Sequence, residues 1–346
     1  MTLNLKQNQN CPPVSIIILT YNGSEYIQPL LDSLSNQSYP QERMEILVVD
    51  NASTDETLSI TRKNFSLVKV VALEKNIGYA AGNNQAFLHA SHDLLVFLNQ
   101  DTICHPGFLQ SMVNIMAADK AIAACNPNIM MPETESFGTM DETFRPESLY
   151  LCDLVPFGYG QNRIINGGKN YCAKFLSGCA FIIRRETVSR LGYLFDDQLW
   201  MYAEDTDLSL RIHNMGQRIC AVQDSIVYHL HNRDIGLKKK GLHLAARAIM
   251  NRVYAYFKNM GSLEFLLFFP LMFLGGNFKI FEFPLTTFRK IVYFLPFSLF
   301  SMSCMVLAIP GLPKFASKKR RVINKRHERG FPILKLLLKG TKINEQ

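Results

Sequence analysis

Short apolar runs alternate with amphipathic stretches over the first 120 residues of the chain. The runs are rich in β-branched and large aliphatic residues, which predicts buried strands over residues 14–20, 45–50, 67–73 and 94–99. Helical spacing or a helix-start signal follows each run, including a capping-box pattern at Ser53–Glu56, a helix over 79–90 and Pro106. Strands that alternate with helices predict an α/β fold with a mostly parallel sheet and right-handed crossovers.

The pattern weakens over residues 126–170, which are rich in Gly, Pro and polar residues and predict a long loop region with room for a short edge hairpin. Beyond it, the pattern predicts a strand over 174–184, a short helix from Glu186, a helix over 204–215 closed by Gly216, and short strands over 218–221 and 225–228. An amphipathic helix is predicted over 241–258, followed by two strongly apolar segments, 263–274 and 291–309.

Positive charge gathers at the end of the chain. The net charge is +8, yet the residues from Gly311 onward hold eleven Lys or Arg and two Glu, so the rest of the chain is nearly neutral. A basic tail suits nucleic acid or an anionic membrane surface, and the apolar segments before it favour the membrane over nucleic acid. Segment 263–274 is too short to span a bilayer, and a span at 291–309 would oppose the positive-inside tendency. We therefore expect helices in the membrane plane or a shallow hairpin, with the tail on anionic head groups.

The eight cysteines are scattered, without a C-x-x-C pair or zinc-finger spacing, and the first ten residues lack the apolar stretch of a signal peptide. These features predict reduced thiols in a cytosolic protein.

Polar side chains follow each of the first four predicted strands. They form four groups: Thr20-Tyr21-Asn22, Asp50-Asn51, Lys75-Asn76-Ile77-Gly78 and Asn99-Gln100-Asp101. In an open parallel sheet, ligands bind at the carboxyl ends of the strands, so these groups predict one binding rim. No G-x-G-x-x-G follows the first strand and no P-loop motif occurs, which argues against a dinucleotide-binding enzyme or a P-loop NTPase.

A second polar group, Glu204-Asp205-Thr206-Asp207, opens the helix predicted over 204–215. Neighbouring carboxylates raise each other's pKa, which suits a general base that works near neutral pH. The alternative interpretation is an acidic first turn stabilised by the helix dipole, with Asp207 and Arg211 as a helix pair.

These segments together resemble family-2 glycosyltransferases, and most closely the bacterial rhamnosyltransferase-like branch, which builds cell-surface polysaccharide such as O-antigen. The segments are VSIIILTYNGSEYIQPLLDSL, EILVVDNASTD, KNIGYAAGNNQAF, LVFLNQD, FLSGCAFIIRR and WMYAEDTDLSLR, within about residues 13–260. The resemblance implies a GT-A fold. Together with the apolar segments and the basic tail, it divides the chain into an N-terminal tail (1–12), a nucleotide-sugar-binding half (13–125), an acceptor-binding half (126–260), and membrane-associating helices with a basic tail (261–346).

The resemblance also implies roles for single residues at the donor site. The nucleotide base is expected against Thr20, Tyr21, Asn22 and Asp50. The ribose and diphosphate are expected against Asn76, Gly78, Gly82 and Asn83, where a glycine lets the backbone approach the ligand. Gly178 is expected near the donor sugar.

Asp101 is expected to bind a divalent cation, Mg²⁺ or Mn²⁺, that bridges the two phosphates. The family's usual Asp-x-Asp motif is replaced here by Asn99-Gln100-Asp101, so Asn99 is expected as a nucleotide contact. His229 is expected to ligate the metal or contact the diphosphate, with a purely structural histidine as the alternative.

Asp205 is expected to be the general base of an inverting transfer, with Glu204 beside it in the catalytic pair. Trp200, the single tryptophan, is expected to stack on an acceptor sugar or to lie in the core.

The predicted activity is transfer of L-rhamnose from dTDP-rhamnose to a saccharide acceptor, linked to a polyprenyl diphosphate, at the cytoplasmic face of the cell membrane. One alternative is a UDP-hexose or UDP-N-acetylhexosamine transferase of the same fold. A nucleotidylyltransferase would need a basic loop after the first strand, and Thr20–Ser24 has no Lys or Arg. A non-catalytic, membrane-bound nucleotide-sugar-binding subunit is the remaining alternative, supported by Asn99 alone.

Overall fold

A computed structural model describes residues 11–64, 68–130, 148–154, 160–166, 170–230, 237–278 and 287–338. The strands are β1 (Val14–Thr20), β2 (Met44–Asp50), β3 (Lys69–Ala72), β4 (Leu94–Asn99), β5 (Thr102–Cys104), β6 (Ile122–Met130), β7 (Ser148–Leu154), β8 (Gly160–Asn166), β9 (Tyr171–Ala173), β10 (Ala180–Arg184) and β11 (Arg218–His229). The helices are α1 (Ile27–Ser35), α2 (Thr57–Asn64), α3 (Tyr79–His89), α4 (Phe108–Ala118), α5 (Arg185–Leu191), α6 (Glu204–Asn214), α7 (Leu237–Asn259), α8 (Ser262–Phe278), α9 (Thr287–Ala308), α10 (Ala316–Asn324) and α11 (Pro332–Leu338).

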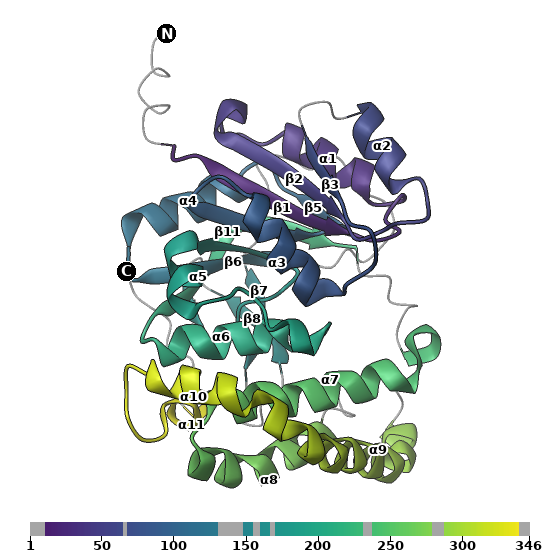
Figure 1. The fold of residues 1–346 in the computed structure, drawn as a ribbon, viewed down its shortest axis with the longest axis vertical. Coiled ribbons are helices and arrows are strands. Elements are labelled where there is room, and N and C mark those ends of the chain that lie inside the picture. Colours follow the sequence, from purple (N-terminus) through teal and green to yellow (C-terminus); the bar gives the residue numbers. More distant parts are fainter. Residues whose placement is uncertain are drawn as a thin grey trace.

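Nine of these strands form one sheet with the order β3-β2-β1-β4-β10-β6-β11-β5, and β9 pairs with β11 (Figure 1). The first four strands in that order are parallel, whereas β10 runs antiparallel between β4 and β6. Strands β7 and β8 form a separate antiparallel hairpin. Because the parallel strands end at the same edge, the loops after β1, β2, β3 and β4 share one rim of the sheet.

Helices cover both faces of the sheet. Ile16 and Ile18 of β1 pack in a core with residues of α1 and α4, whereas Ile17 and Leu19 pack in a second core with residues of α3 and α6. Both faces of β1 are therefore buried, which explains its continuous apolar run.

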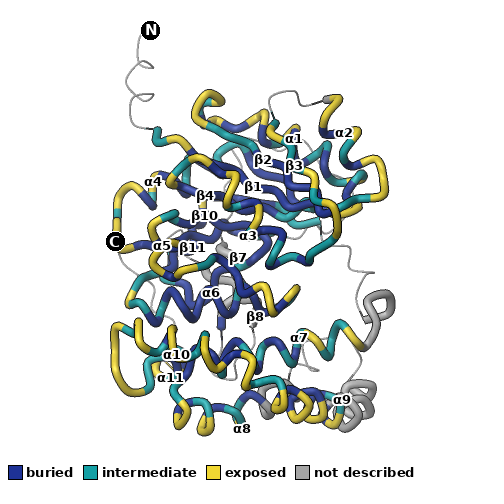
Figure 2. The backbone as a smooth tube through the Cα atoms, in the orientation of Figure 1, coloured by how far each residue is buried: buried dark blue, intermediate teal, exposed yellow. Residues whose placement is uncertain are grey.

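The C-terminal helices form an additional layer beneath α6 (Figure 1). A third core joins Leu210 of α6 to Val253 and Tyr256 of α7, Phe268 of α8 and Met305 of α9. The expected boundary near residue 260 falls between α7 and α8, and this core crosses it. Exposed positions of α8 and α9 lie on the side away from the sheet (Figure 2).

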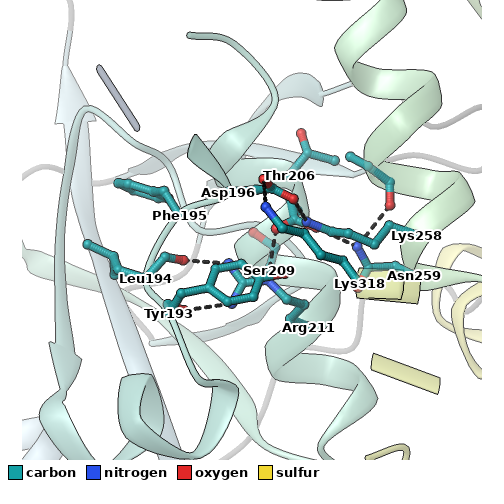
Figure 3. Close-up of polar contacts among 12 residues, drawn as sticks. Tyr193, Leu194, Phe195, Asp196, Thr206, Ser209, Arg211, Lys258, Asn259 and Lys318 are labelled. Carbon is teal, nitrogen blue, oxygen red and sulfur yellow. Dashed lines mark hydrogen bonds and ion pairs between the residues drawn. The ribbon is translucent and has the colours of Figure 1, made fainter. Parts of the chain in front are cut away.

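A buried network of charges ties this layer to α6 (Figure 3). Asp207 lies 2.8 Å from Arg211 Nε and 2.8 Å from Lys258 Nζ. Lys258 Nζ also lies 2.6 Å from Asp196, which forms a further ion pair with Lys318 of α10. The structure thus favours the helix-pair interpretation of Asp207, because its carboxylate is enclosed by cations and fully buried.

The basic tail is partly folded onto the protein, and the expected contact of the tail with lipid head groups stays a prediction. Lys318 pairs with Asp196, and the Lys319 ammonium lies 4.0 Å from the centre of the Phe257 ring. Arg326 pairs with Glu264 at 3.0 Å. Within the described residues, one helical stretch, Ser298–Asn324, is long and apolar enough to cross a membrane, and 28% of its apolar window is buried.

Most predicted elements are confirmed, with the strands over 14–20 and 94–99 reproduced to the residue. The strand predicted over 174–184 is wrong in its first half, because β10 begins at Ala180. In that half, Leu176 N donates to Ser209 Oγ of α6 and Ser177 N to Asn126 Oδ1 of β6, so side chains replace strand partners. The two short strands predicted after residue 217 are one strand, β11, whose pairing shifts between Val222 and Ile226.

Candidate active site

The end of β1 is clamped to the end of β4 by one side chain. Gln100 Oε1 accepts hydrogen bonds from Thr20 Oγ1 at 2.7 Å and from Tyr21 N at 2.8 Å. Gln100 Nε2 donates to Tyr21 O at 3.3 Å. Thr20 is buried, whereas Tyr21 and Asn22 are exposed at the rim, as expected of residues that receive a ligand.

Asp50 organises the loop after β2. Its carboxylate accepts hydrogen bonds from the backbone N and the hydroxyl of Ser53, and the residue is 1% exposed. Asn22 joins this loop as well, because Asn22 N donates to Ser53 Oγ and Asn22 Oδ1 accepts from Thr54 N. The contact expected between Asp50 and a base stays a prediction, and the bonds observed explain its burial.

The loop after β3 is held by Asn51. Asn51 Nδ2 donates to Asn76 Oδ1 at 3.1 Å and to Gly78 O at 3.2 Å, and Asn51 Oδ1 accepts from Ile77 N at 2.9 Å. Gly78 has φ of 86°, in the left-handed region that favours glycine. An added Cβ at Gly78 would come within 2.6 Å of the Trp200 ring, so both conformation and space require glycine here.

Gly82 and Asn83 face inward from α3. A Cβ on Gly82 would come within 2.7 Å of the Leu19 side chain, so this glycine lets α3 pack against β1. Asn83 is 2% exposed and donates to Tyr79 O within its own helix. The contact expected between these two residues and the ribose and diphosphate stays a prediction, and the packing observed explains their burial.

Asp101 and His229 are brought together by strand pairing. Strand β5 runs antiparallel to the end of β11 with His229 opposite Thr102, and Leu230 N donates to Asp101 O. His229 Nε2 then lies 3.3 Å from Asp101 Oδ1. Burial opposes protonation of this ring, but its contacts with Cys179 and Asp101 raise the pKa of His229 to about 10.

These side chains fit a divalent cation. The Asp101 carboxylate supplies oxygen donors, and the His229 imidazole supplies a nitrogen donor once a cation displaces its proton. Asn99 Oδ1 nearby in the chain is buried without a hydrogen-bond partner in the described structure. Across the described ranges, no three His, Cys, Asp or Glu side chains gather closely enough to hold a metal ion. A cation here would therefore take further ligands from phosphate or water.

Asp205 lies at the start of α6, beside the chain segment that leads into β10. Its Oδ2 accepts from Gly178 N at 3.4 Å and its Oδ1 from Thr206 N at 2.6 Å. Tyr79 of α3 donates its hydroxyl to Gly178 O at 2.7 Å. Burial raises the pKa of Asp205 even though both N–H groups favour the ionised form. Asp205, the expected base, and Gly178, expected near the donor sugar, thus lie in contact.

Glu204 is more deeply enclosed than Asp205. The residue is 6% exposed and its Oε2 has no hydrogen-bond partner among the described residues. Burial, reinforced by the charge of Asp205, raises the pKa of Glu204 to about 8. The pKa values of both carboxyl groups are thus raised, and the pair binds protons more tightly than two exposed carboxyl groups would.

Trp200 lies between the two halves of the site and not in the core. It is 39% exposed, its ring lies over Gly78, and its carbonyl oxygen accepts from Ala80 N at 3.0 Å. An aromatic face beside the loop of Gly78 is available to a sugar or to the nucleotide.

Several residues that shape this site are only weakly indicated by the sequence pattern. Asn51 and Gln100 lie at strand ends next to expected ligand contacts, so their position places them at the rim. Their role in holding the loops together could not be predicted from that position. Tyr79 carried no signal, because its hydroxyl partner is distant in the sequence.

The parallel strand-end rim and the helices on both faces of the sheet are those of the GT-A fold. Residues 15–192 match the model of glycosyl transferase family 2, and the chain belongs to this family. It is therefore a glycosyltransferase.

Curated relatives agree with this assignment. An uncharacterized glycosyltransferase of Haemophilus influenzae is 23% identical over 72% of this chain and 76% of its own length. The poly(ribitol-phosphate) beta-N-acetylglucosaminyltransferase TarS of Staphylococcus aureus is 40% identical over 25% of this chain and 16% of its own. The O-antigen biosynthesis protein RfbC of Myxococcus xanthus is 30% identical over 63% of this chain, and this chain spans 17% of it.

Solved structures show the same fold. Residues 1–349 of TarS from S. aureus, in complex with UDP, have a TM-score of 0.55 with 19% identity, covering 94% of this chain and 90% of that one. The mannosyltransferase PcManGT of Pyrobaculum calidifontis, in complex with GDP-Man and Mn²⁺, also has a TM-score of 0.55, with 18% identity over 95% and 87% of the two chains.

Proposed function

We propose that this glycosyltransferase transfers a sugar from a nucleoside diphosphate sugar to a saccharide acceptor, with inversion of the anomeric configuration. The observation that carries the proposal is the Asp205 carboxylate, which is partly buried, has a raised pKa and lies against Gly178 beside the strand-end rim. Such a transfer needs a binding site for the nucleotide, which the rim would supply, and a general base for the acceptor hydroxyl, which α6 would supply.

In the proposed reaction, the acceptor hydroxyl gives its proton to Asp205 while its oxygen forms a bond to the anomeric carbon. The bond from that carbon to the diphosphate oxygen breaks, and its electron pair leaves with the nucleoside diphosphate. Attack from the face opposite the leaving group inverts the anomeric configuration. Asn51 and Gln100 keep the loops of the rim in position through their hydrogen bonds.

Asp101 and His229 would hold a divalent cation, Mg²⁺ or Mn²⁺, on the donor diphosphate. When bound, such a cation neutralises charge on the leaving phosphates. PcManGT and GalNAc-T7, which share the fold, were solved with Mn²⁺.

For the donor we propose dTDP-L-rhamnose, because the motif segments resemble the rhamnosyltransferase-like branch and RfbC is named for O-antigen biosynthesis. UDP-N-acetylhexosamine is the second candidate, favoured by TarS, whose solved structures contain UDP or UDP-GlcNAc. Thymine and uracil, the nucleobases of these two donors, present the same N–H and carbonyl groups to the loop of Asp50.

One experiment tests the reaction and the donor together. The purified protein is incubated with Mn²⁺, a panel of nucleotide sugars and acceptor saccharides, and release of nucleoside diphosphate is measured. We expect turnover with dTDP-rhamnose and a loss of about 10²–10⁴-fold in kcat for Asp205→Asn with donor affinity retained. An Asp205→Asn variant with full turnover would refute the role of Asp205, and turnover with UDP-GlcNAc alone would replace the donor.

We further propose that the acceptor is linked to a polyprenyl diphosphate and that the enzyme works at the cytoplasmic membrane surface. The support is an apolar surface on the C-terminal helices, which we call the α8–α9 face. Its members are exposed large apolar residues: Leu263, Leu266, Leu267, Leu299, Met302, Val306, Leu307 and Ile309. Exposed apolar groups on neighbouring helices suit insertion into the head-group region of a bilayer.

A further inference from the structure

The turn that leads into the Glu204–Asp205 pair is strained. Trp200, Tyr202 and Ala203 have φ values of 60°, 73° and 63°. Residues with a Cβ seldom adopt this left-handed region, and three of them within four positions persist only where the surroundings hold the backbone. Something other than local preference must therefore fix this turn.

The holding contact comes from α7. Asn251 Nδ2 lies 2.6 Å from Leu199 O, 3.0 Å from Met201 O and 3.1 Å from Tyr202 O. Asn251 is 6% exposed, so water competes little for these carbonyl groups. The two N–H groups of this one amide thus serve three carbonyls of the turn, with one N–H shared, and fix the direction of the backbone through it.

The turn connects both halves of the active site. On the donor side, Trp200 O accepts from Ala80 N, and the Trp200 ring lies over Gly78. On the other side, Ala203 precedes the acidic pair directly, and its carbonyl oxygen accepts from Asp207 N at 2.9 Å as α6 begins. A shift of the turn would displace the donor loop and the proposed base relative to each other.

We propose that Asn251 is a positioning residue for the transfer reaction, which rests on the proposed role of Asp205 as the base. It holds the strained turn in the shape that sets Asp205 and Trp200 against the donor loop. Asn251 lies outside residues 15–192, the segment that matches the family model. Helix α7 therefore completes the active site and does more than connect it to the helical layer.

The single tryptophan provides a direct test, because Trp200 is part of the turn. Asn251→Asp keeps the shape of the side chain but replaces the donor with a carboxylate that repels the three carbonyls. We expect kcat to fall about tenfold to a hundredfold, a smaller change in donor KM, and a shift in Trp200 emission with faster acrylamide quenching. Asn324→Asp, an exposed position in α10, is the matched control and should change none of these readings.

An unchanged Trp200 emission in Asn251→Asp would refute the proposal that Asn251 holds the turn. A changed emission with wild-type kcat would mean that holding the turn is unimportant for transfer. A fall in kcat that only matches the fall in folded, UDP-binding protein would make Asn251 purely structural. Asn251→Ser, which keeps one donor and adds no charge, replaces Asn251→Asp if the latter does not fold. If the wild-type enzyme transfers no sugar, the proposed function fails, while emission and UDP affinity still test whether Asn251 holds the turn.

Discussion

At the scale of single residues, the active site depends on polar groups whose environments differ. Asp205 is partly exposed and has two N–H donors, whereas Glu204 is enclosed and has an oxygen without a partner in the described structure. Burial is the main cause that raises the pKa of both carboxyl groups, and the pKa of Glu204, whose buried oxygen lacks such a donor, reaches about 8.

The pair predicts a pH dependence. Glu204 is protonated below about pH 8, so Glu204→Gln should retain activity within about threefold at pH 7, because a neutral side chain replaces a neutral side chain. In the wild type, the raised pKa of Glu204 favours folding at low pH, and this contribution is lost as pH rises towards 8.

Glu204→Gln should therefore unfold at a temperature that varies less between pH 5 and pH 9 than that of the wild type. Thermal unfolding across this range, with kcat measured at each pH, provides the check. A loss of 10²-fold or more at pH 7 would instead mean that Glu204 exchanges a proton in the reaction.

At the scale of elements, charge pairs fix α6 against the C-terminal helices. Asp207 of α6 accepts from Arg211, Lys258 and Asn259, and all of these groups are buried. Removing one member of a buried ion network leaves its partners without compensation, which costs more than the intact network contributes.

Asp207→Asn should therefore lower the free energy of unfolding by about 3–5 kcal/mol. Asp197→Asn makes the same change at an ion pair with Lys318 where the Asp197 side chain is 64% exposed, and should cost at most about 1 kcal/mol. Urea unfolding of the two variants and the wild type distinguishes these outcomes. Equal stabilities would contradict a structural role for Asp207.

The sequence pattern predicted elements best where burial is uniform. The strand at 94–99 is apolar up to its last residue, Asn99, because both faces are covered, and its boundaries were right. Strand β6 was missed because Asn126 and Asn128 resemble loop residues. Both are buried, and Asn126 is satisfied by Phe175 O and Ser177 N, partners that local sequence does not reveal.

The residues of the candidate active site were likewise predictable only where their place in the fold follows from the local sequence. The strand-end rule found Asp50, Asn76 and Asp101 because topology alone brings these positions to one rim. It could not find Asn251, which lies on a helix far along the chain and acts through carbonyl groups that every residue has. A residue that acts by binding backbone carbonyls cannot be recognised from the hydrophobic pattern of the sequence.

At the scale of the whole molecule, the α8–α9 face lies on the side away from the sheet (Figure 2). The protein should therefore bind lipid vesicles through this face, with a large contribution from apolar contacts. Leu266→Glu replaces a residue that is 68% exposed with a charge, and the vesicle-bound fraction should fall about tenfold or more.

Leu88→Glu is the matched control, because Leu88 is also 68% exposed but lies on α3. Flotation with neutral and with anionic vesicles gives the measurement for both variants. Equal binding of the Leu266→Glu variant and the wild type would exclude this face as the membrane contact.

The buried charge network has a consequence for exchanging parts between relatives. Residues 15–192 carry the family match, yet Asp196 and Asp207 beyond it are neutralised by Lys258 and Lys318 from helices still further along the chain. A hybrid enzyme that joins this chain, up to the end of α6, to the C-terminal helices of another family member would keep both carboxylates without their cations. A functional chimera should therefore contain Lys258 and Lys318 as well as Asp196 and Asp207.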